Sequence, residues 1–313
     1  MTDDMIVLKI PLDALDGIQR VIQIQDIKKR KLPVGSHGFA RLNDCMGDDR
    51  SISQQARVSY ISNASSNADA EKDYKLLRFL MSQEHFSPFA SVQIKMHYKM
   101  PLAIVAQWCR IRGHHRSEMS ARYSVMPDEC IIVDNWRIPS KHNKQVSEGS
   151  VDEAMQVELA HLQIQAYEHS RAIYNKMLEM GAPKEQARFV LPVGQYTELI
   201  MTINLGDMMR LLLQRLHPHA QAEIREYAEA TLKILKDLYP VAFEAFRDYQ
   251  LEARKFSRQE WNLLNSFFGS GKDPRCLANM PRQLRQQVFS DHEINSKSDR
   301  VALMKKLDIY HLI

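Results

Sequence analysis

The stretch SVQIKMHYKMPLAIVAQWCRIR, residues 91–112, predicts the fold class of this 313-residue chain. Its first part alternates polar positions with apolar ones, which are Val92, Ile94, Met96 and Tyr98. This alternation over Ser91–Lys99 is typical of a half-buried β-strand. Pro101 then opens an apolar run that is expected to be helical, because proline is best tolerated in the first turn of a helix. A strand that leads directly into a helix predicts a protein that uses both elements.

Periodic segments on both sides of this stretch are mostly helical. Helices are expected near Asp69–Gln83, Asp207–Leu213, Pro218–Leu238 and Pro240–Phe256. Ser150 and Glu153 read as a capping box before a long helix that ends near Gly181 and Pro183, and Asp207 is expected to cap a helix. Cys130–Val133 is a candidate second strand. The sequence therefore predicts an α+β fold with more helix than strand.

Composition excludes several classes of protein. The chain is 44% hydrophobic and 26% charged, as in an ordinary soluble globular protein, and no apolar run is long enough to span a membrane. The four cysteines are scattered without a CxxC pair, which argues against a zinc ribbon or a disulfide framework and suits the cytoplasm. A net charge of +4 fits the binding of small anionic ligands.

The segment that follows the strand, QWCRIRGHHRSEMSARYS at residues 107–124, carries the chemistry. Its guanidinium groups are rigid donors suited to phosphate and carbonyl oxygens, and they belong to Arg110, Arg112, Arg116 and Arg122. Gln107, Glu118 and Ser120 can orient a heterocycle by directional hydrogen bonds. The alternative is a solvated basic loop, which is less expected directly after an apolar helix.

This segment resembles the signature of the flavin-dependent thymidylate synthase family, which is Arg-His-Arg followed at a fixed spacing by Ser and then Arg-Tyr. Here Arg110-Ile111-Arg112, Ser120 and Arg122-Tyr123 stand at that spacing. Further landmarks occur in family order across residues 37–250: His85 with Pro88-Phe89, Ala187-Arg188, Tyr196-Thr197, Asn204, Arg215 and His219-Ala-Gln221. The resemblance implies a helix-rich α+β domain with a small antiparallel sheet over 37–250. Residues 1–36 would then be an N-terminal appendage and 251–313 a C-terminal helical extension.

The resemblance also implies an activity and a set of sites. The family transfers a one-carbon unit from methylenetetrahydrofolate to C5 of dUMP, with FAD as cofactor and NADPH as reductant, in homotetramers with shared sites. The implied nucleotide-binding residues are Gln107, Arg110, Glu118, Ser120, Arg122, Arg188 and Arg215. The implied cofactor-binding residues are His85, Ser87, Arg110, Arg112, Asn204, Arg210 and His219. Within these sets, catalytic roles fall to Ser120, Arg215 and His85.

The sequence departs from the family on the flavin side. Ile111 replaces the histidine of Arg-His-Arg, and the other departures are Ala90, His115, Ser117, Gly206 and Arg210. Arg210 is a candidate to supply the cation that is missing at Gly206. Because Gln107, Glu118, Ser120 and Arg215 match the uracil-reading pattern of the family, we expect dUMP to be preferred over dCMP. The choice between a methylated and a hydroxymethylated product is less constrained.

Several alternatives stay open at this stage. One is hydroxymethylation or another C5 substitution of dUMP or dCMP, and another is a nucleotide-binding homologue without catalysis. The lack of interleaved aromatic residues argues against RNA or DNA binding. The sequence disfavours three further roles: Cys109 as a nucleophile, Ser120 in a catalytic triad, and a metal site formed by His114, His115, His217 and His219.

Overall fold

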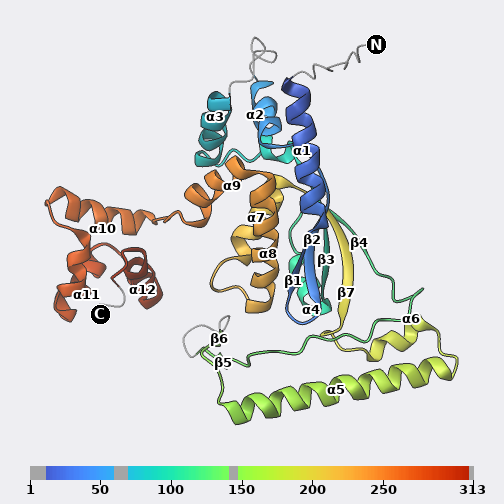
Figure 1. Cartoon of the computed structure of the whole chain (residues 1–313). Coiled ribbons are helices and arrows are strands. Elements are labelled where there is room, and N and C mark those ends of the chain that lie inside the picture. The colour runs from blue at the N-terminus through green and yellow to red at the C-terminus, as the bar shows by residue number, and fades with distance from the viewer. Residues whose placement is uncertain (1–11, 60–69, 141–146, 310–313) are drawn as a thin grey trace, which may run out of the picture. The chain divides into compact units, whose positions relative to one another are not determined.

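Five antiparallel strands form the central sheet of the computed structural model, which describes residues 12–59, 70–140 and 147–309 (Figure 1). In spatial order they are β1 (Lys31–Val34), β2 (Gly38–Met46), β3 (Gln93–Pro101), β7 (Tyr196–Asn204) and β4 (His114–Glu118). The strand predicted at 91–99 is therefore present as β3, shifted by two residues, in the middle of the sheet. The α+β fold with a small antiparallel sheet is confirmed.

The alternating residues of β3 face the main hydrophobic core. Ile94, Met96 and Tyr98 are fully buried, and the opposite strand β7 places Ile203, Met201 and Leu199 directly beside them. Aligned apolar side chains on neighbouring strands fix the register, since a shift by one residue would turn all of them to the other face.

Helices pack with this face of the sheet into one hydrophobic core. They are α1 (Leu12–Lys29), α2 (Asp49–Arg57), α3 (Ala70–Ser82), α4 (Leu102–Trp108), α7 (Leu205–Arg215), α8 (Ala222–Leu238) and α9 (Pro240–Phe246). Helix α8 packs against β1, β2, α4 and α7, and it buries Tyr227, Ile234 and Leu235. The apolar core thus lies between α8 and the strands.

The opposite face of the sheet carries a polar network. Arg41 Nε on β2 lies 2.9 Å from His97 Nδ1 on β3, and His97 Nε2 lies 2.8 Å from Glu198 Oε2 on β7. Burial lowers the pKa of His97, the Glu198 carboxylate opposes this, and the nearby Arg41 charge adds to it. The neutral imidazole can then accept from Arg41 and donate to Glu198, which ties three strands together.

Two further groups of elements complete the chain. The first comprises β5 (Ile138–Pro139), β6 (Ser147–Glu148), α5 (Glu153–Glu179) and α6 (Lys184–Ala187). The second is a separate compact unit from Glu252 to Ile313 that contains α10 (Arg258–Gly269), α11 (Arg282–Asp291) and α12 (Lys297–Lys306) around its own small core. The first unit spans Met1–Leu251.

The first 36 residues, expected to form an appendage, contribute to the first unit where they are described. Strand β1 pairs with β2 along its whole length, and Ile27 and Val34 are buried in the main core. No helix in the described ranges is both long enough and apolar enough to cross a membrane.

Some expected element boundaries were wrong. The helix expected to run to Arg112 ends at Trp108, and Cys130 makes only an isolated bridge to Gln195 instead of starting a strand. Asp152, not Ser150, caps α5 by accepting a hydrogen bond from the Met155 amide at 2.9 Å. Serine and aspartate both accept hydrogen bonds at helix starts, so the pattern alone could not choose between Ser150 and Asp152.

The Asp49 side chain connects α2 to the start of α9. Its carboxylate accepts hydrogen bonds from the Val241 and Ala242 amides at the start of α9, both at 3.0 Å. Asp49→Ala should lower the free energy of unfolding by about 1–2 kcal/mol, the usual cost of a lost helix cap. Chemical denaturation at pH 7 measures this loss, and an unchanged midpoint would contradict it.

The same carboxyl predicts a pH dependence. Burial raises the pKa of Asp49 to about 6, against an ordinary value of 3.8, although the two backbone hydrogen bonds oppose the rise. Because the pKa is raised in the folded state, protonation of Asp49 adds stability that is complete below pH 3.8 and is lost as the pH rises through 6, whereas the two hydrogen bonds from backbone amides are still accepted by the carboxylate at pH 7. The stability difference between the wild type and Asp49→Asn, which cannot titrate, should shift against the wild type across that window.

Candidate functional site

The polar segment 107–124 leaves α4, turns at Gly113 and returns to the sheet as its edge strand β4. Gly113 has a φ of +79°, and a side chain there would collide with the carboxylate of Asp207. This close approach explains why glycine is needed at the turn. The segment is therefore pressed against the start of α7, which places the predicted nucleotide and flavin residues on neighbouring elements.

Gln107 and Arg215 form the first group of predicted residues that the structure brings together. Arg215 Nη2, at the end of α7, donates to the backbone oxygen of Gln107 at 2.6 Å. Gln107 Nε2 in turn donates to Gln221 Oε1 at 2.8 Å. Burial lowers the pKa of Arg215, and the neighbouring Arg110 lowers it further. Arg215 Nε is buried and has no hydrogen-bond partner among the described residues, so this group offers a free donor inside the fold.

Arg122 and Arg188 form the second group, and Glu185 on α6 links them. Arg122 Nε donates to Glu185 Oε2 at 2.8 Å, and Arg188 Nε lies 3.3 Å from the Glu185 backbone oxygen. Ser120 Oγ accepts from the Arg122 amide at 3.3 Å, so it supports the loop that carries this arginine. Arg122 is exposed and Arg188 is half-buried, and two guanidinium groups on neighbouring segments suit a phosphate. Sequence reasoning did not identify Glu185, because its role depends on a contact between distant segments.

The third group gathers around Phe86 and the start of α7. Asn204 caps α7 by accepting from the Asp207 amide at 2.8 Å, so the expectation that Asp207 is the cap was wrong. Asp207 instead accepts from Asn204 Nδ2 at 2.7 Å and from Arg210 Nη1 at 2.9 Å. The Arg210 guanidinium lies 4.9 Å from the centre of the Phe86 ring. His85 and Ser87, both exposed, flank Phe86 in the chain.

The remaining predicted residues belong to none of these three groups. Arg110, Arg112, Glu118 and His219 are exposed, whereas Ile111 packs partly against the main core. His114 Nδ1 lies 2.8 Å from the Ile111 backbone oxygen, so the His114 ring is held by the turn itself. No hydrogen bond or ion pair within the described ranges joins the three groups to one another.

Two of the disfavoured roles were a nucleophilic Cys109 and a metal site. Burial raises the pKa of Cys109, although the nearby Arg116 opposes the rise, so little thiolate is available for nucleophilic attack at neutral pH. Among the residues that the structure describes, no group of three or more His, Cys, Asp or Glu side chains could hold a metal ion.

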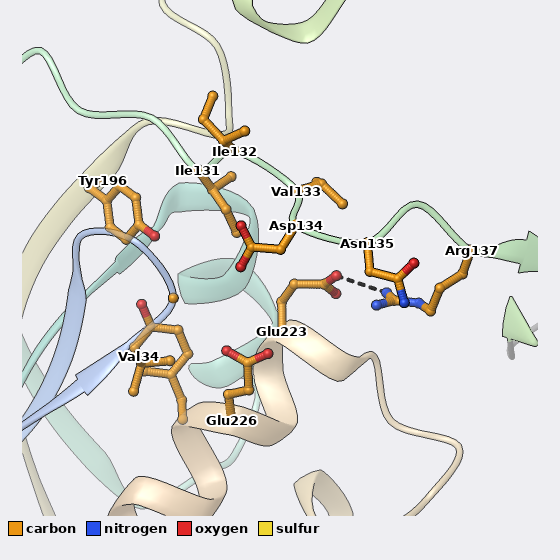
Figure 2. Close-up of a pocket in the computed structure, with 12 residues that line it drawn as sticks. Val34, Ile131, Ile132, Val133, Asp134, Asn135, Arg137, Tyr196, Glu223 and Glu226 are labelled. Carbon is orange, nitrogen blue, oxygen red and sulfur yellow. Dashed lines mark hydrogen bonds and ion pairs between the residues drawn. The ribbon is translucent and has the colours of Figure 1, made fainter. Parts of the chain in front are cut away.

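A cavity that sequence reasoning did not anticipate lies beside the first group. Figure 2 shows it between the end of β1, the 131–137 segment, Tyr196 and the first turns of α8. Three carboxylates line it, from Asp134, Glu223 and Glu226, and Arg137 forms an ion pair with Glu223 at 2.8 Å. Burial raises the pKa of Glu226, and the charges of Glu223 and Asp134 raise it further.

Known proteins are similar to this chain in sequence and in fold. Residues 41–241 match the Thy1 family, described as thymidylate synthase complementing protein. A flavin-dependent thymidylate synthase from Thermus thermophilus is 40% identical over 234 residues, which cover 74% of this chain and 84% of that protein. A flavin-dependent thymidylate synthase from Rickettsia conorii is 34% identical over 281 residues, covering 85% of this chain and 95% of that protein.

A solved structure agrees with these sequence matches. The UMP/dUMP methylase PolB from Streptomyces cacaoi, bound with 5-Br dUMP, superposes with a TM-score of 0.64 at 27% identity, covering 70% of this chain and 99% of that chain. The resemblance drawn from the Arg110–Tyr123 motif is thereby confirmed, and this chain belongs to the Thy1 family of thymidylate synthase complementing proteins.

Proposed function

We propose that this protein is a flavin-dependent thymidylate synthase that methylates dUMP at C5, with residues 37–250 as its catalytic domain. Family membership supports the reaction, and one structural observation supports the site: the buried, unpartnered Nε of Arg215 beside Gln107. An unpaired buried donor costs about 1–3 kcal/mol, and a carbonyl oxygen of a bound pyrimidine would pair with it. Hydroxymethylation, the main alternative, has no comparable observation in its favour.

The first group would bind and polarise the base. Arg215 would place positive charge beside a ring carbonyl, where it would stabilise the enolate-like negative charge that makes C5 nucleophilic. Its lowered pKa reflects burial, and burial strengthens its interaction with a developing negative charge. Glu118 and Ser120, at the end of β4 and just after it, would complete the contacts to the nucleotide. The chain needs no nucleophile of its own for this role.

The second group would bind the phosphate. Arg122 donates to Glu185 through Nε. Its two terminal nitrogens would then be able to donate to two oxygens of the phosphate. Arg188 approaches the same carboxylate-bearing residue from the next turn of the chain. Glu185 therefore orients Arg122 without neutralising both arginines.

The third group would bind the flavin, which we infer to be FAD. A bound flavin supplies the reducing equivalents, drawn from NADPH, that convert the carbon from methylenetetrahydrofolate into a methyl group. The donor set fits such a ligand: Arg110, Arg112 and Arg210 are cations for a diphosphate, and Asn204, Ser87, His85 and His219 are hydrogen-bonding groups for the rings. Arg210 is held in place by Asp207 and by the Phe86 ring.

We also infer a homotetramer with sites shared between subunits. Arg110, Arg122 and His85 are exposed in a single chain, although catalysis requires water to be excluded. Helix α5 also exposes Val157 and Leu162, at 67% and 52%. A neighbouring subunit that covers these surfaces would account for both observations.

The reaction itself is the first test. The protein incubated with dUMP, methylenetetrahydrofolate, FAD and NADPH should yield a nucleotide heavier by a methyl group, as measured by mass spectrometry. Omitting NADPH should abolish the product, which serves as the control. A hydroxymethyl mass would replace this proposal with the alternative reaction, and an unmodified nucleotide would reject catalysis.

The phosphate assignment gives a second prediction. Arg122→Ala and Arg188→Ala should each weaken dUMP binding by about 1.5–3 kcal/mol, the scale of a charge-assisted hydrogen bond. Calorimetric titration measures this change. Arg247→Ala is a matched control, because Arg247 is exposed and pairs only with its neighbour Asp248. If both site variants bind dUMP as tightly as the control, the phosphate lies elsewhere.

The cofactor assignment gives a third prediction. Arg210→Met keeps the apolar stem over Phe86 but removes the charge, so FAD should bind about tenfold more weakly. Flavin fluorescence during titration reports the affinity, with Arg247→Met as the control. Equal FAD affinity in both variants would remove Arg210 from the flavin site.

A further inference from the structure

Helix α5 directs polar side chains at the backbone of the segment 126–136, which runs alongside it in Figure 1. Toward the end of this segment, Gln156 Nε2 donates to the Trp136 backbone oxygen at 2.9 Å. Near its middle, Gln163 Nε2 donates to the Ile131 backbone oxygen at 3.1 Å. The segment therefore obtains part of its backbone hydrogen bonding from the side chains of a helix.

Arg171 of α5 contacts three consecutive residues at the start of this segment. Its Nη1 donates to the Met126 backbone oxygen at 3.0 Å, and its Nη2 donates to the Pro127 backbone oxygen at 2.5 Å. Its Nε forms an ion pair with Asp128 Oδ1 at 2.8 Å. The Arg171 side chain is only 12% exposed, and its guanidinium lies 5.3 Å from the centre of the Tyr174 ring. Because the guanidinium is planar and all three of its nitrogens are bonded, it fixes the backbone that it contacts.

The backbone held by Arg171 is the far end of the loop that carries Arg122. The near end of this loop directly follows β4, where the Met119 amide donates to a backbone oxygen of β7 at 2.9 Å. Between the two ends the chain turns on Ser120, whose backbone oxygen accepts from the Ser124 amide at 3.1 Å. The position from which the Arg122 side chain leaves the loop therefore depends on both ends.

Ser170, the residue before Arg171, holds the segment that carries the other arginine of the second group. Ser170 Oγ donates to the Val190 backbone oxygen, at the end of the 3₁₀ turn that begins at Arg188. Two adjacent residues of one helix thus contact both arginine-bearing segments. Because a helix is a rigid element, these contacts tie the spacing of the two segments to α5.

We propose that Arg171 and Ser170 are positioning residues for the phosphate of the nucleotide. Arg171 would place Arg122, Ser170 would place Arg188, and α5 would set the distance between the two guanidinium groups. Hydrogen bonds weaken steeply when a donor is misplaced, so two arginines bind one phosphate well only at a suitable spacing. This inference rests on the proposed function, since it takes these arginines as the phosphate-binding pair.

Arg171→Met tests the first contact, because it removes all three nitrogens and keeps an apolar side chain of similar shape beside the Tyr174 ring. We expect dUMP to bind about tenfold more weakly, although Arg171 itself does not contact the nucleotide. Ser170→Ala removes one hydroxyl and should weaken dUMP binding about threefold. Calorimetric titration measures both values. Deoxyuridine, which lacks the phosphate, should bind both variants as it binds the wild type, as measured by competition with dUMP.

The two variants should act through different arginines, and this crossed pattern is the readout that a general loss of structure would not produce. In an Arg122→Ala background, Arg171→Met should have little additional effect on dUMP binding, whereas Ser170→Ala should keep its effect. In an Arg188→Ala background, Ser170→Ala should lose its effect and Arg171→Met should keep it. A variant that merely loosens the fold would weaken binding alike in both backgrounds.

Gln163→Met is the matched control. It removes hydrogen bonds between the same helix and the same segment, but at the Ile131 oxygen and the Val133 amide, beyond the part that Arg171 holds. Its affinity for dUMP should equal that of the wild type. Circular dichroism and the thermal midpoint compare the folding of all variants, and Ser170→Ala carries the test if Arg171→Met does not fold.

The outcomes are distinguishable. If the wild type does not bind dUMP, the proposed function is wrong and this inference falls with it. If the wild type binds dUMP but Arg171→Met and Ser170→Ala bind it as tightly as Gln163→Met does, only the inference is overturned. Equal losses for dUMP and deoxyuridine would also overturn it, as would effects that persist undiminished in both arginine backgrounds, since the two residues would then act by another route.

Discussion

The Asn204 side chain accepts a hydrogen bond from the Asp207 amide at the junction where β7 becomes α7, and this junction positions much of the candidate site. Strand β7 pairs with β3 on one side and β4 on the other, so the sheet fixes its register on both edges. The first residue of α7 is then also fixed, because the Leu205 amide donates to the Val92 carbonyl at 2.9 Å. Arg210 and Arg215 lie five residues apart on that helix, roughly 7.5 Å along its axis and on different faces. Arg210 contacts the Phe86 ring, and Arg215 donates to the Gln107 backbone oxygen.

This placement concentrates positive charge, which needs a balancing anion. Arg110 lowers the pKa of Arg215 beyond the effect of burial, which shows that the two guanidinium groups repel each other in the folded chain. Each of Arg122 and Arg210 has one carboxylate, from Glu185 and Asp207, and those contacts hold the side chains while leaving other nitrogens available. Ion pairs of this exposed kind add little to stability, so orientation is their main effect. The arrangement favours a ligand that brings both phosphate and carbonyl oxygens.

Much of this could be predicted from the sequence, where local patterns are strong. The alternation at residues 92–98 identified the central strand β3, and the Arg110–Tyr123 motif led to the family. The expectations that were wrong concern a helix end and a helix cap, and both depend on contacts between distant segments. The helix after Pro101 stops at Trp108 because the chain must cross to the sheet edge as β4, and no local signal marks that crossing. Asn204 and Asp207 are both good caps, and only the path of β7 shows which one begins the helix.

The departures from the family pattern are also connected through space. Gly206 is buried, and a side chain there would approach the Phe86 backbone oxygen within 3.3 Å, so an arginine at this position would require the Phe86 segment to move. Arg210 stands four residues later, on the same face of α7, and its guanidinium reaches the Phe86 ring. Arg210 therefore places a cation beside Phe86 one helical turn after Gly206. At another departure, Ile111, the side chain packs against the core. The His114 ring bonds to the Ile111 backbone oxygen across the Gly113 turn. Gly206 and Arg210 therefore both lie beside Phe86, whereas Gln107 and Arg215 form the group that we propose binds the nucleotide.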